Sequence, residues 1–257
     1  MGTVHPSQAP GAGVPGRVDV LIPIYRTELT QAEAFAVDQS VRVLGHYGVC
    51  FFGPRGLDVS YYAARYPGAR FSFFEPEYFT SVNGYSRLLL REDFYLGDSV
   101  SEFMLIVQPD VYVFRDELAR WLAAPFDYVG APWPDGIEIN IAAGKFAAVG
   151  GKPVKVYVGN GGFSLRRRRK CAALLREHAE IAEWFIKTGS SEDLFFAFMG
   201  ALSSDFVMPN QMMAAAFSWE LRPEHYHALM GGVLPMGAHA YEKHSPEFWL
   251  NYIAEKS

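Results

Sequence analysis

The stretch Val18-Asp19-Val20-Leu21-Ile22-Pro23-Ile24-Tyr25 is a short and nearly continuous apolar run. Runs of this kind suit a strand that is buried on both faces of a parallel sheet. Pro23 marks the expected end of the strand, because proline has no amide proton to donate to a ladder. Residues 102–107 form a second run of the same character. The two runs predict a sheet that is covered on both sides.

Helical segments separate the apolar runs in the first half of the chain. Residues 30–44 have helical spacing, and Thr30 with Glu33 three residues later fits a capping box. We expect further strands over residues 47–52, 69–74 and 126–129, and further helices over residues 59–66, 82–95 (with Asn83 as a candidate cap) and 116–123. This alternation predicts an α/β fold with a mostly parallel central sheet and helices on both faces.

The second half of the chain has a less regular pattern. Residues 134–153 are rich in glycine and alanine, which predicts a loop or a mobile lid. Strands are expected to flank a tight Gly-Asn-Gly-Gly turn, over residues 155–158 and 162–165, and helices are expected over residues 167–178, 179–187, 192–199 and 210–217. With no repeat and no long linker in view, we expect a disordered leader, residues 1–16, and a single domain, residues 17–257.

The composition bounds the class of protein. The chain has 257 residues, half of them hydrophobic, and its net charge of −5 argues against a nucleic-acid binder. The dense basic run, residues 166–170, is interpreted as a solvated helix start, with a phosphate-facing edge or an anionic membrane surface as alternatives. Cys50 and Cys171 are expected to be small buried residues, which fits a reducing, cytoplasmic location. No apolar run approaches the roughly 18 residues that span a membrane.

Two segments carry side chains suited to ligand binding. Asp110 follows a buried strand in the string Gln108-Pro109-Asp110, where a carboxylate could hold a divalent ion on a diphosphate or could begin a turn. The string Gly159-Asn160-Gly161-Gly162 allows close approach of a ligand to the backbone, or a tight hairpin. It is neither a P-loop nor a dinucleotide fingerprint.

Two further segments carry titratable groups. Glu192 and Asp193 begin a helix, where they could complement its dipole or provide a general base. His239 follows Gly237-Ala238 and could ligate a metal, contact a phosphate or be structural. No Gly-x-Ser-x-Gly or His-Glu-x-x-His string is present, which argues against a serine hydrolase and a zincin.

Taken together, these strings resemble a known family. In chain order they are Tyr85-Ser86-Arg87-Leu88-Leu89-Leu90, Val107-Gln108-Pro109-Asp110, Asp127-Tyr128-Val129-Gly130-Ala131-Pro132-Trp133, Gly159-Asn160-Gly161-Gly162-Phe163-Ser164-Leu165-Arg166, Glu192-Asp193 and Gly237-Ala238-His239. This order resembles a family catalogued as a domain of unknown function and regarded as GT-A-like glycosyltransferases. The resemblance covers roughly residues 18–248, and it implies a Rossmann-like GT-A fold that binds a nucleotide-diphosphate sugar.

The resemblance also implies roles for individual residues. A divalent cation, Mn²⁺ or Mg²⁺, is implied at Asp110 and His239, although Gln108 stands where the family's Asp-x-Asp motif has its first acid. Glu192 or Asp193 matches the base of inverting members. The donor nucleotide sugar is expected to contact Pro23, Tyr25, Arg87, Gln108, Asp110, Asn160, Gly161, Gly162 and Trp133.

The sequence therefore predicts a glycosyltransferase that moves a sugar from a nucleotide-diphosphate sugar to an acceptor hydroxyl with inversion. Surface polysaccharide or other glycan synthesis is the context suggested by analogy, and peripheral membrane contact is a further option. A non-catalytic nucleotide- or carbohydrate-binding protein is the main alternative, which Gln108 favours. A nucleotidyltransferase would need two metal-binding carboxylates, and the sequence does not offer them.

Overall fold

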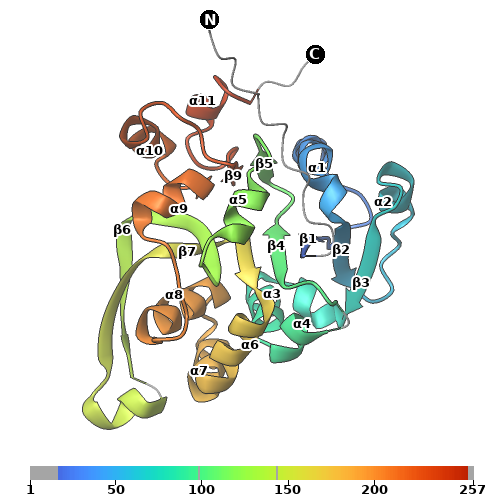
Figure 1. Cartoon of the computed structure of the whole chain (residues 1–257). Helices are drawn as coiled ribbons and strands as arrows, with labels where there is room; N and C mark the ends of the chain where they lie inside the picture. Colours follow the sequence, from blue (N-terminus) through green and yellow to red (C-terminus); the bar gives the residue numbers. More distant parts are fainter. Residues whose placement is uncertain (1–16, 98, 143, 254–257) are drawn as a thin grey trace, which may run out of the picture.

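A six-stranded sheet forms the centre of the molecule (Figure 1). The computed structural model describes residues 17–97, 99–142 and 144–253, so the expected leader lies outside the described residues. The strand order is β3-β2-β1-β4-β7-β6, in which β1, β2, β3 and β4 run parallel, while β7 is antiparallel to both of its neighbours. The bounds are β1 Val18–Pro23, β2 Val49–Pro54, β3 Arg70–Phe74, β4 Phe103–Val107, β6 Tyr128–Ile141 and β7 Lys152–Arg167. The expected α/β class with a mostly parallel sheet is confirmed.

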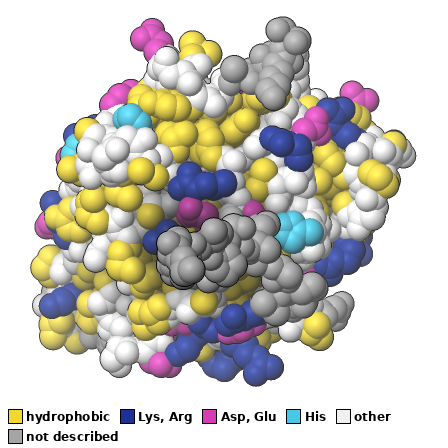
Figure 2. Space-filling view, turned by 45° about the horizontal axis from the view of Figure 1, so that its top comes forward, with side chains coloured by type: hydrophobic (Ala, Val, Ile, Leu, Met, Phe, Trp, Pro, Cys, Tyr) yellow, Lys and Arg dark blue, Asp and Glu magenta, His cyan; other side chains and the backbone are white. Residues whose placement is uncertain are grey.

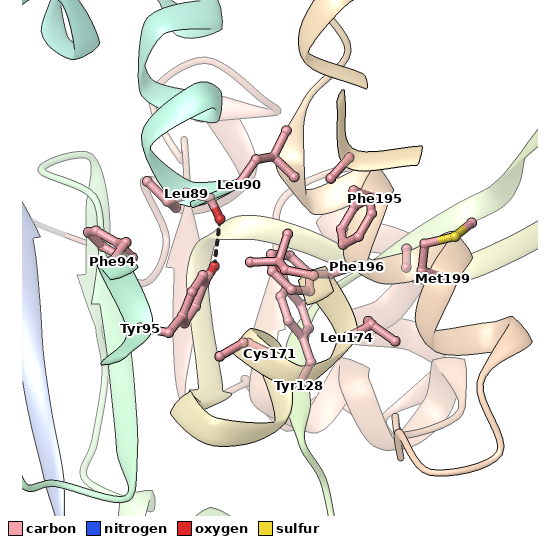
Figure 3. Packing of buried hydrophobic residues seen from close by; sticks show 14 of the residues in the cluster. Leu89, Leu90, Phe94, Tyr95, Tyr128, Cys171, Leu174, Phe195, Phe196 and Met199 are labelled. Carbon is pink, nitrogen blue, oxygen red and sulfur yellow. Dashed lines mark hydrogen bonds between the residues drawn. The ribbon is translucent and has the colours of Figure 1, made fainter. Parts of the chain in front are cut away.

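Helices cover both faces of this sheet, and each face has its own hydrophobic cluster. Side chains of β1 alternate between them: Val20 and Ile22 pack with α1 and α2 on one face, whereas Leu21 packs on the other. Figure 3 shows part of this other cluster, where Tyr95 and Tyr128 meet Phe196. The helices are α1 Gln31–Leu44, α2 Ser60–Arg65, α3 Val82–Leu89, α4 Glu92–Leu96, α5 Leu118–Ala123, α6 Arg168–Glu177, α7 Ala179–Thr188 and α8 Glu192–Leu202.

A smaller three-stranded sheet, in the order β5-β9-β8, adjoins the carboxyl end of β4. Strand β5 follows β4 after a short turn and pairs with β9, which places Val111 opposite His239. The C-terminal part of the chain therefore returns to the end of a central strand. The remaining elements are β5 Val111–Val113, β8 Ser218–Trp219, β9 Gly237–His239, α9 Gln211–Phe217, α10 Pro223–Leu229, α11 Pro246–Trp249, η1 Gly45–Tyr47, η2 Pro76–Phe79 and η3 Gly144–Val149.

Helix starts illustrate where local signals succeed and fail. The capping box of α1 is present, with the Thr30 side chain accepting from Glu33 and the Glu33 carboxylate accepting from the Thr30 amide. The helix expected over residues 82–95 is instead two helices, α3 and α4, and Ser81 rather than Asn83 caps the first. The break has a physical reason, because Glu92 and Asp93 begin a new first turn, where acidic side chains complement the helix dipole.

The loop expected over residues 134–153 is wrong at both ends of the segment, which are strands. Strand β6 runs to Ile141 and β7 begins at Lys152, so the two form a long hairpin that extends from the body of the domain (Figure 1). Ile137, Ile139 and Val154 pack against the hydrophobic cluster that α7 and α8 share. The alternating isoleucines are a period-two signal typical of a half-buried strand, and the glycine content of the segment obscured it.

The Gly-Asn-Gly-Gly turn is also wrong, because all four residues lie inside the continuous strand β7. Between two successive pairings, Val129 with Leu165 and Ala131 with Asn160, β6 advances two residues and β7 advances five. The three extra residues form an irregular bulge in β7. Bulges of this kind occur next to active sites, where they redirect side chains.

The basic run includes a helix start, that of α6 at Arg168, but it is only partly solvated. Arg166 is 0% exposed and contacts Glu192, and Arg168 is buried and contacts Asp19. Strand β7 ends at Arg167 and α6 begins at Arg168, and each element turns one arginine of the run toward the interior. Cys50 and Cys171 are free and buried, as expected.

Figure 2 shows the molecule with the α10–α11 end turned toward the viewer, and charges of both signs are present over the coloured part of this surface. Among the described residues, no helix has the length and apolar character that crossing a bilayer requires.

Candidate active site

A cleft of about 500 Å³ opens at the carboxyl ends of β1 and β4. In open α/β sheets, ligands bind at this edge. The cleft brings together four of the residues expected from sequence, which are Pro23, Tyr25, Gln108 and Asp110, and adds others that sequence reasoning did not assign. The added residues are Glu33, Phe79, Thr80, Ser81, Val82, Tyr85 and Pro109.

Gln108 and Asp110 are fixed by the turn between β4 and β5. The amide of Gln108 donates to the carbonyl of Gly162 at 2.9 Å, and its own carbonyl accepts from Val111 at 2.9 Å. Because β5 pairs with β9, His239 reaches the same point. Its Nε2 lies 3.0 Å from Gln108 Oε1 and 3.4 Å from Asp110 Oδ1. The structure thus brings together the Asp110 and His239 pair that the resemblance implied.

The other nitrogen of His239 faces a second polar group. Its Nδ1 lies 3.1 Å from Asn160 Oδ1 and 3.6 Å from Glu220 Oε1. Glu220 also contacts the Asn160 amide and lies 3.6 Å from Nε2 of His244. Sequence reasoning missed Glu220, which carries no motif and is recruited only because β8 and β9 are neighbours.

The electrostatics of this cluster favour charged groups. Burial alone would lower the pKa of His239, but hydrogen bonds and charges from Asp110 and Glu220 outweigh it and raise the pKa to about 9. Burial alone would raise the pKa of Asp110, but the hydrogen bond and charge of His239 outweigh it and lower the pKa. The ammonium of Lys243 also lowers the pKa of Asp110, which puts a cation at this end of the cleft. Lys243 was likewise missed by sequence reasoning.

The bulge in β7 requires glycine at two positions. A Cβ atom at Gly162 would lie 2.2 Å from atoms of the His239 ring, and one at Gly161 would lie 2.9 Å from both Arg166 Nη2 and Glu192 Oε1. Neither position has room for a side chain. Because these positions are glycine, β7 packs closely against His239 at Gly162 and against the start of α8 at Gly161.

The two acidic residues at the start of α8 have different surroundings. Glu192 is buried, accepts from Ser86 at 3.0 Å and pairs with Arg166 at 3.1 Å. Asp193 is partly exposed, and its Oδ1 accepts from the Ser191 hydroxyl at 2.5 Å and from the Leu194 amide at 2.7 Å. Burial and the charge of Glu192 raise the pKa of Asp193 to about 6. Of the two, Asp193 has the surroundings of a group that can exchange a proton near neutral pH.

Five of the nine expected donor contacts are not among the residues that line the cleft, namely Arg87, Trp133, Asn160, Gly161 and Gly162. The Arg87 guanidinium contacts Glu77 at 3.1 Å and lies over the Tyr78 ring, and Arg87 is not among the residues that line the cleft. Trp133 is 6% exposed, belongs to the hydrophobic core and packs where Gly159 leaves space. Their roles in binding the donor or the acceptor stay predictions.

The donor set does not fit a metal held by protein groups alone. Among the residues that the structure describes, no three His, Cys, Asp or Glu side chains are grouped so as to hold a metal ion. Asp110 and His239 offer one carboxylate and one imidazole, and both ring nitrogens of His239 already have partners. The Asp110 carboxylate remains the one anionic oxygen donor of this pair.

Three solved glycosyltransferase structures share the fold of this chain. The galactosyltransferase LgtC, in complex with donor and acceptor sugar analogues, is 14% identical with a TM-score of 0.53, and the match covers 86% of each chain. Mouse xyloside xylosyltransferase 1 is 10% identical with a TM-score of 0.51, covering 86% of this chain and 97% of that one. The glycosyltransferase GlyE of Streptococcus pneumoniae TIGR4 is 13% identical with a TM-score of 0.50, covering 92% of this chain and 60% of that one. At these identities the likeness shows the fold, which is the GT-A fold.

No curated protein matches the chain. A family described as "Protein of unknown function (DUF5672)" matches residues 68–239. The matched region is about two thirds of the 257 residues and includes the turn after β4, the bulge of β7, the start of α8 and His239. The chain belongs to the DUF5672 family of proteins of unknown function.

Proposed function

We propose that this protein is a glycosyltransferase that moves a sugar from a nucleotide-diphosphate sugar to an acceptor hydroxyl, with inversion at the anomeric carbon. One observation carries the proposal. The bulge of β7 joins a cleft at the carboxyl ends of β1 and β4 to a partly exposed carboxylate, Asp193, at the start of α8. The GT-A fold supports the proposal but does not decide the activity, because one fold hosts many functions.

The cleft suits the nucleotide and the diphosphate. Tyr25 is 48% exposed at its mouth, which leaves a ring face available for stacking on a base. Glu33 and Asp110 are acidic, and no lysine or arginine is among the lining residues. A diphosphate bound there needs positive charge from outside the lining, and Lys243 lies near enough to Asp110 to supply it. We propose a divalent cation only as a companion of the diphosphate, with Asp110 offering one oxygen.

Asp193 is the proposed general base. In the transfer, the acceptor oxygen forms a bond to the anomeric carbon while the bond from that carbon to the diphosphate oxygen breaks. The acceptor proton passes to the Asp193 carboxylate, and the nucleoside diphosphate leaves with the electron pair. A pKa of about 6 leaves this carboxylate mostly ionised at neutral pH and basic enough to accept the proton. Glu192 is unsuited to the role, because Arg166 and Ser86 hold it.

The acceptor and the cellular setting are proposed only as classes. A hydroxyl of a glycan, such as a surface polysaccharide, is the acceptor class, and the start of the β6–β7 hairpin is the proposed acceptor wall. Cytoplasmic location with peripheral membrane contact remains part of the proposal. A second candidate is a non-catalytic nucleotide-binding protein. It is favoured by Gln108, which contacts His239 where an acidic side chain would hold a cation more strongly.

The test has a binding arm and a catalytic arm. Thermal shift with UDP, GDP and their sugar derivatives, each with Mn²⁺ and with chelator, measures whether a ligand stabilises the folded protein. Product formation is then compared between the wild type and Asp193→Asn, with Asp205→Asn as the matched control, because Asp205 is a well-exposed carboxylate. Loss of transfer in Asp193→Asn alone supports the proposal. Binding without turnover in the wild type would favour the non-catalytic alternative.

A further inference from the structure

The hydroxyl of Tyr85 is buried without a hydrogen-bond partner among the described residues. Tyr85 lies on α3, its ring stacks on Phe52 with centroids 6.2 Å apart, and the residue lines the cleft. Buried polar atoms in native proteins are nearly always paired, so each exception calls for an explanation. An unpaired buried hydroxyl that lines a ligand cleft has a direct one, namely that the ligand is its partner.

Other buried tyrosines in the same core are paired. The hydroxyl of Tyr95 donates to the carbonyl of Leu89 at 2.9 Å, as Figure 3 shows, and accepts from Arg166 at 2.9 Å. The hydroxyl of Tyr128 donates to the carbonyl of Gly159 at 2.7 Å. The fold therefore satisfies tyrosine hydroxyls in this region where no cleft is involved. Among the described residues, the other buried atoms without a hydrogen-bond partner include those of Glu117, Trp121, Ser218 and Trp249, and none of these residues lines this cleft.

The surroundings of the Tyr85 hydroxyl fix what it can do. Burial raises its pKa, so the group is a neutral hydroxyl at any pH near neutrality and can donate a proton to a hydrogen bond. The Gln108 amide lies beside it and lowers its pKa, but no hydrogen bond of ordinary geometry joins the two. The charges of Glu192 and Arg166 also act on its pKa, so the hydroxyl lies near the charged groups at the start of α8 as well as near Gln108.

We propose that the Tyr85 hydroxyl donates a hydrogen bond to the sugar of the bound donor and so helps to select and position that sugar. The inference rests on the proposed function, in which the diphosphate lies at the Asp110 end and the reacting sugar lies between that end and Asp193. On the same helix, the Arg87 side chain contacts Glu77, and its expected contact with the donor stays a prediction.

The substitution Tyr85→Phe tests this directly, because it keeps the ring that packs on Phe52 and removes only the hydroxyl. Affinities are measured by calorimetry for UDP-glucose, UDP-galactose, GDP-mannose, UDP and GDP in the presence of Mn²⁺. We expect the dissociation constant of the nucleotide sugar that the wild type prefers to rise about 2- to 12-fold, which is one neutral hydrogen bond. The affinity for the matching nucleoside diphosphate should not change. Equal weakening of both ligands, or of neither, would overturn the sugar contact.

A second measurement needs no ligand. Removing an unpaired hydroxyl should leave the free energy of unfolding of Tyr85→Phe at or slightly above the wild-type value, whereas Tyr95→Phe should lower it, because two hydrogen bonds are lost. A loss in Tyr85→Phe equal to that in Tyr95→Phe would show an internal partner and overturn the inference. If the wild type binds none of the five ligands, the proposed function fails, and this stability comparison alone decides whether the hydroxyl is kept for a ligand.

Discussion

The bulge of β7 separates two polar clusters, one beside the cleft and one buried in the core. On one side of Gly162, His239 contacts Gln108, Asp110 and Asn160 beside the cleft. On the side of Gly161, Arg166 and Glu192 form an ion pair that is almost completely buried. We call these the cleft cluster and the buried cluster. The cleft cluster has a carboxylate and a cation next to the open cleft, so a bound ligand can contact them. The buried cluster has no access to the cleft, so substitutions in it are expected to change the stability of the fold.

The largest expected effect is on the buried cluster. Arg166→Met leaves the Glu192 carboxylate buried without its cationic partner, and we expect a loss of about 3–5 kcal/mol in the free energy of unfolding. Denaturant unfolding measures it, with Arg169→Met, on an exposed residue, as the control within about 0.5 kcal/mol of wild type. Adding Glu192→Gln should restore part of the loss. A stability equal to wild type in Arg166→Met would remove the contrast between the clusters.

The next largest effect is expected from alanine at Gly162 and Gly161, whose two variants should respond differently to a second substitution. In Gly162→Ala the new methyl group overlaps the His239 ring, so we expect about 1–3 kcal/mol of destabilisation together with weaker nucleotide binding. The second change His239→Ala should restore stability by removing the overlap, without restoring binding. Gly161→Ala meets the Arg166–Glu192 pair instead, and His239→Ala should not rescue it. Rescue of both glycine variants by the same change would show that the clusters are not independent.

These glycines also show how far sequence reasoning reaches. The parallel strands and α1 could be predicted, because continuous apolar runs and a capping box are local signals. The Gly-Asn-Gly-Gly string indicated that another group packs closely against the backbone, but it did not indicate a bulge. The bulge depends on the pairing of β7 with β6, which lies outside the string. Asp110 and His239 were paired through the resemblance. Glu220 could not be found, because its place depends on the packing of β8 and β9.

Buried charge was the other failure of sequence reasoning. A run of basic residues is usually solvated, and nothing local marks Arg166 as the partner of Glu192, 26 residues away. The run begins with the last two residues of β7, where strand alternation turns Arg166 inward, and it continues into α6 from Arg168. Only the three-dimensional structure places both ends of this ion pair together. The sequence therefore predicted the acidic pair of α8 but could not assign different roles to Glu192 and Asp193.

A smaller effect concerns pH at the junction of the two clusters. Because Asp193 has a pKa of about 6 in the folded protein, above its unfolded value of 3.8, the folded state binds more protons between these two values. The free energy of unfolding should therefore fall as the pH rises from about 4 to about 6, and Asp193→Asn should flatten that fall. Over the same range the transfer rate should rise, because the base must be ionised, and it should level off above pH 7. A rate that does not vary between pH 5 and pH 8 would exclude Asp193 as the base.

The smallest expected effect belongs to the exposed edge of the cleft cluster. Lys243→Ala removes a surface cation that acts on Asp110, so we expect unchanged stability and a 2- to 5-fold weaker binding of nucleoside diphosphates, roughly the 0.3–1 kcal/mol of an exposed charge contact. The loss should be larger at about 20 mM salt than at about 500 mM, because salt screens exposed charges. Lys187→Ala, which removes another exposed lysine, is the control. A loss of affinity that does not depend on salt would mean that Lys243 acts through packing. The cleft cluster would then be no more accessible to solvent than the buried cluster.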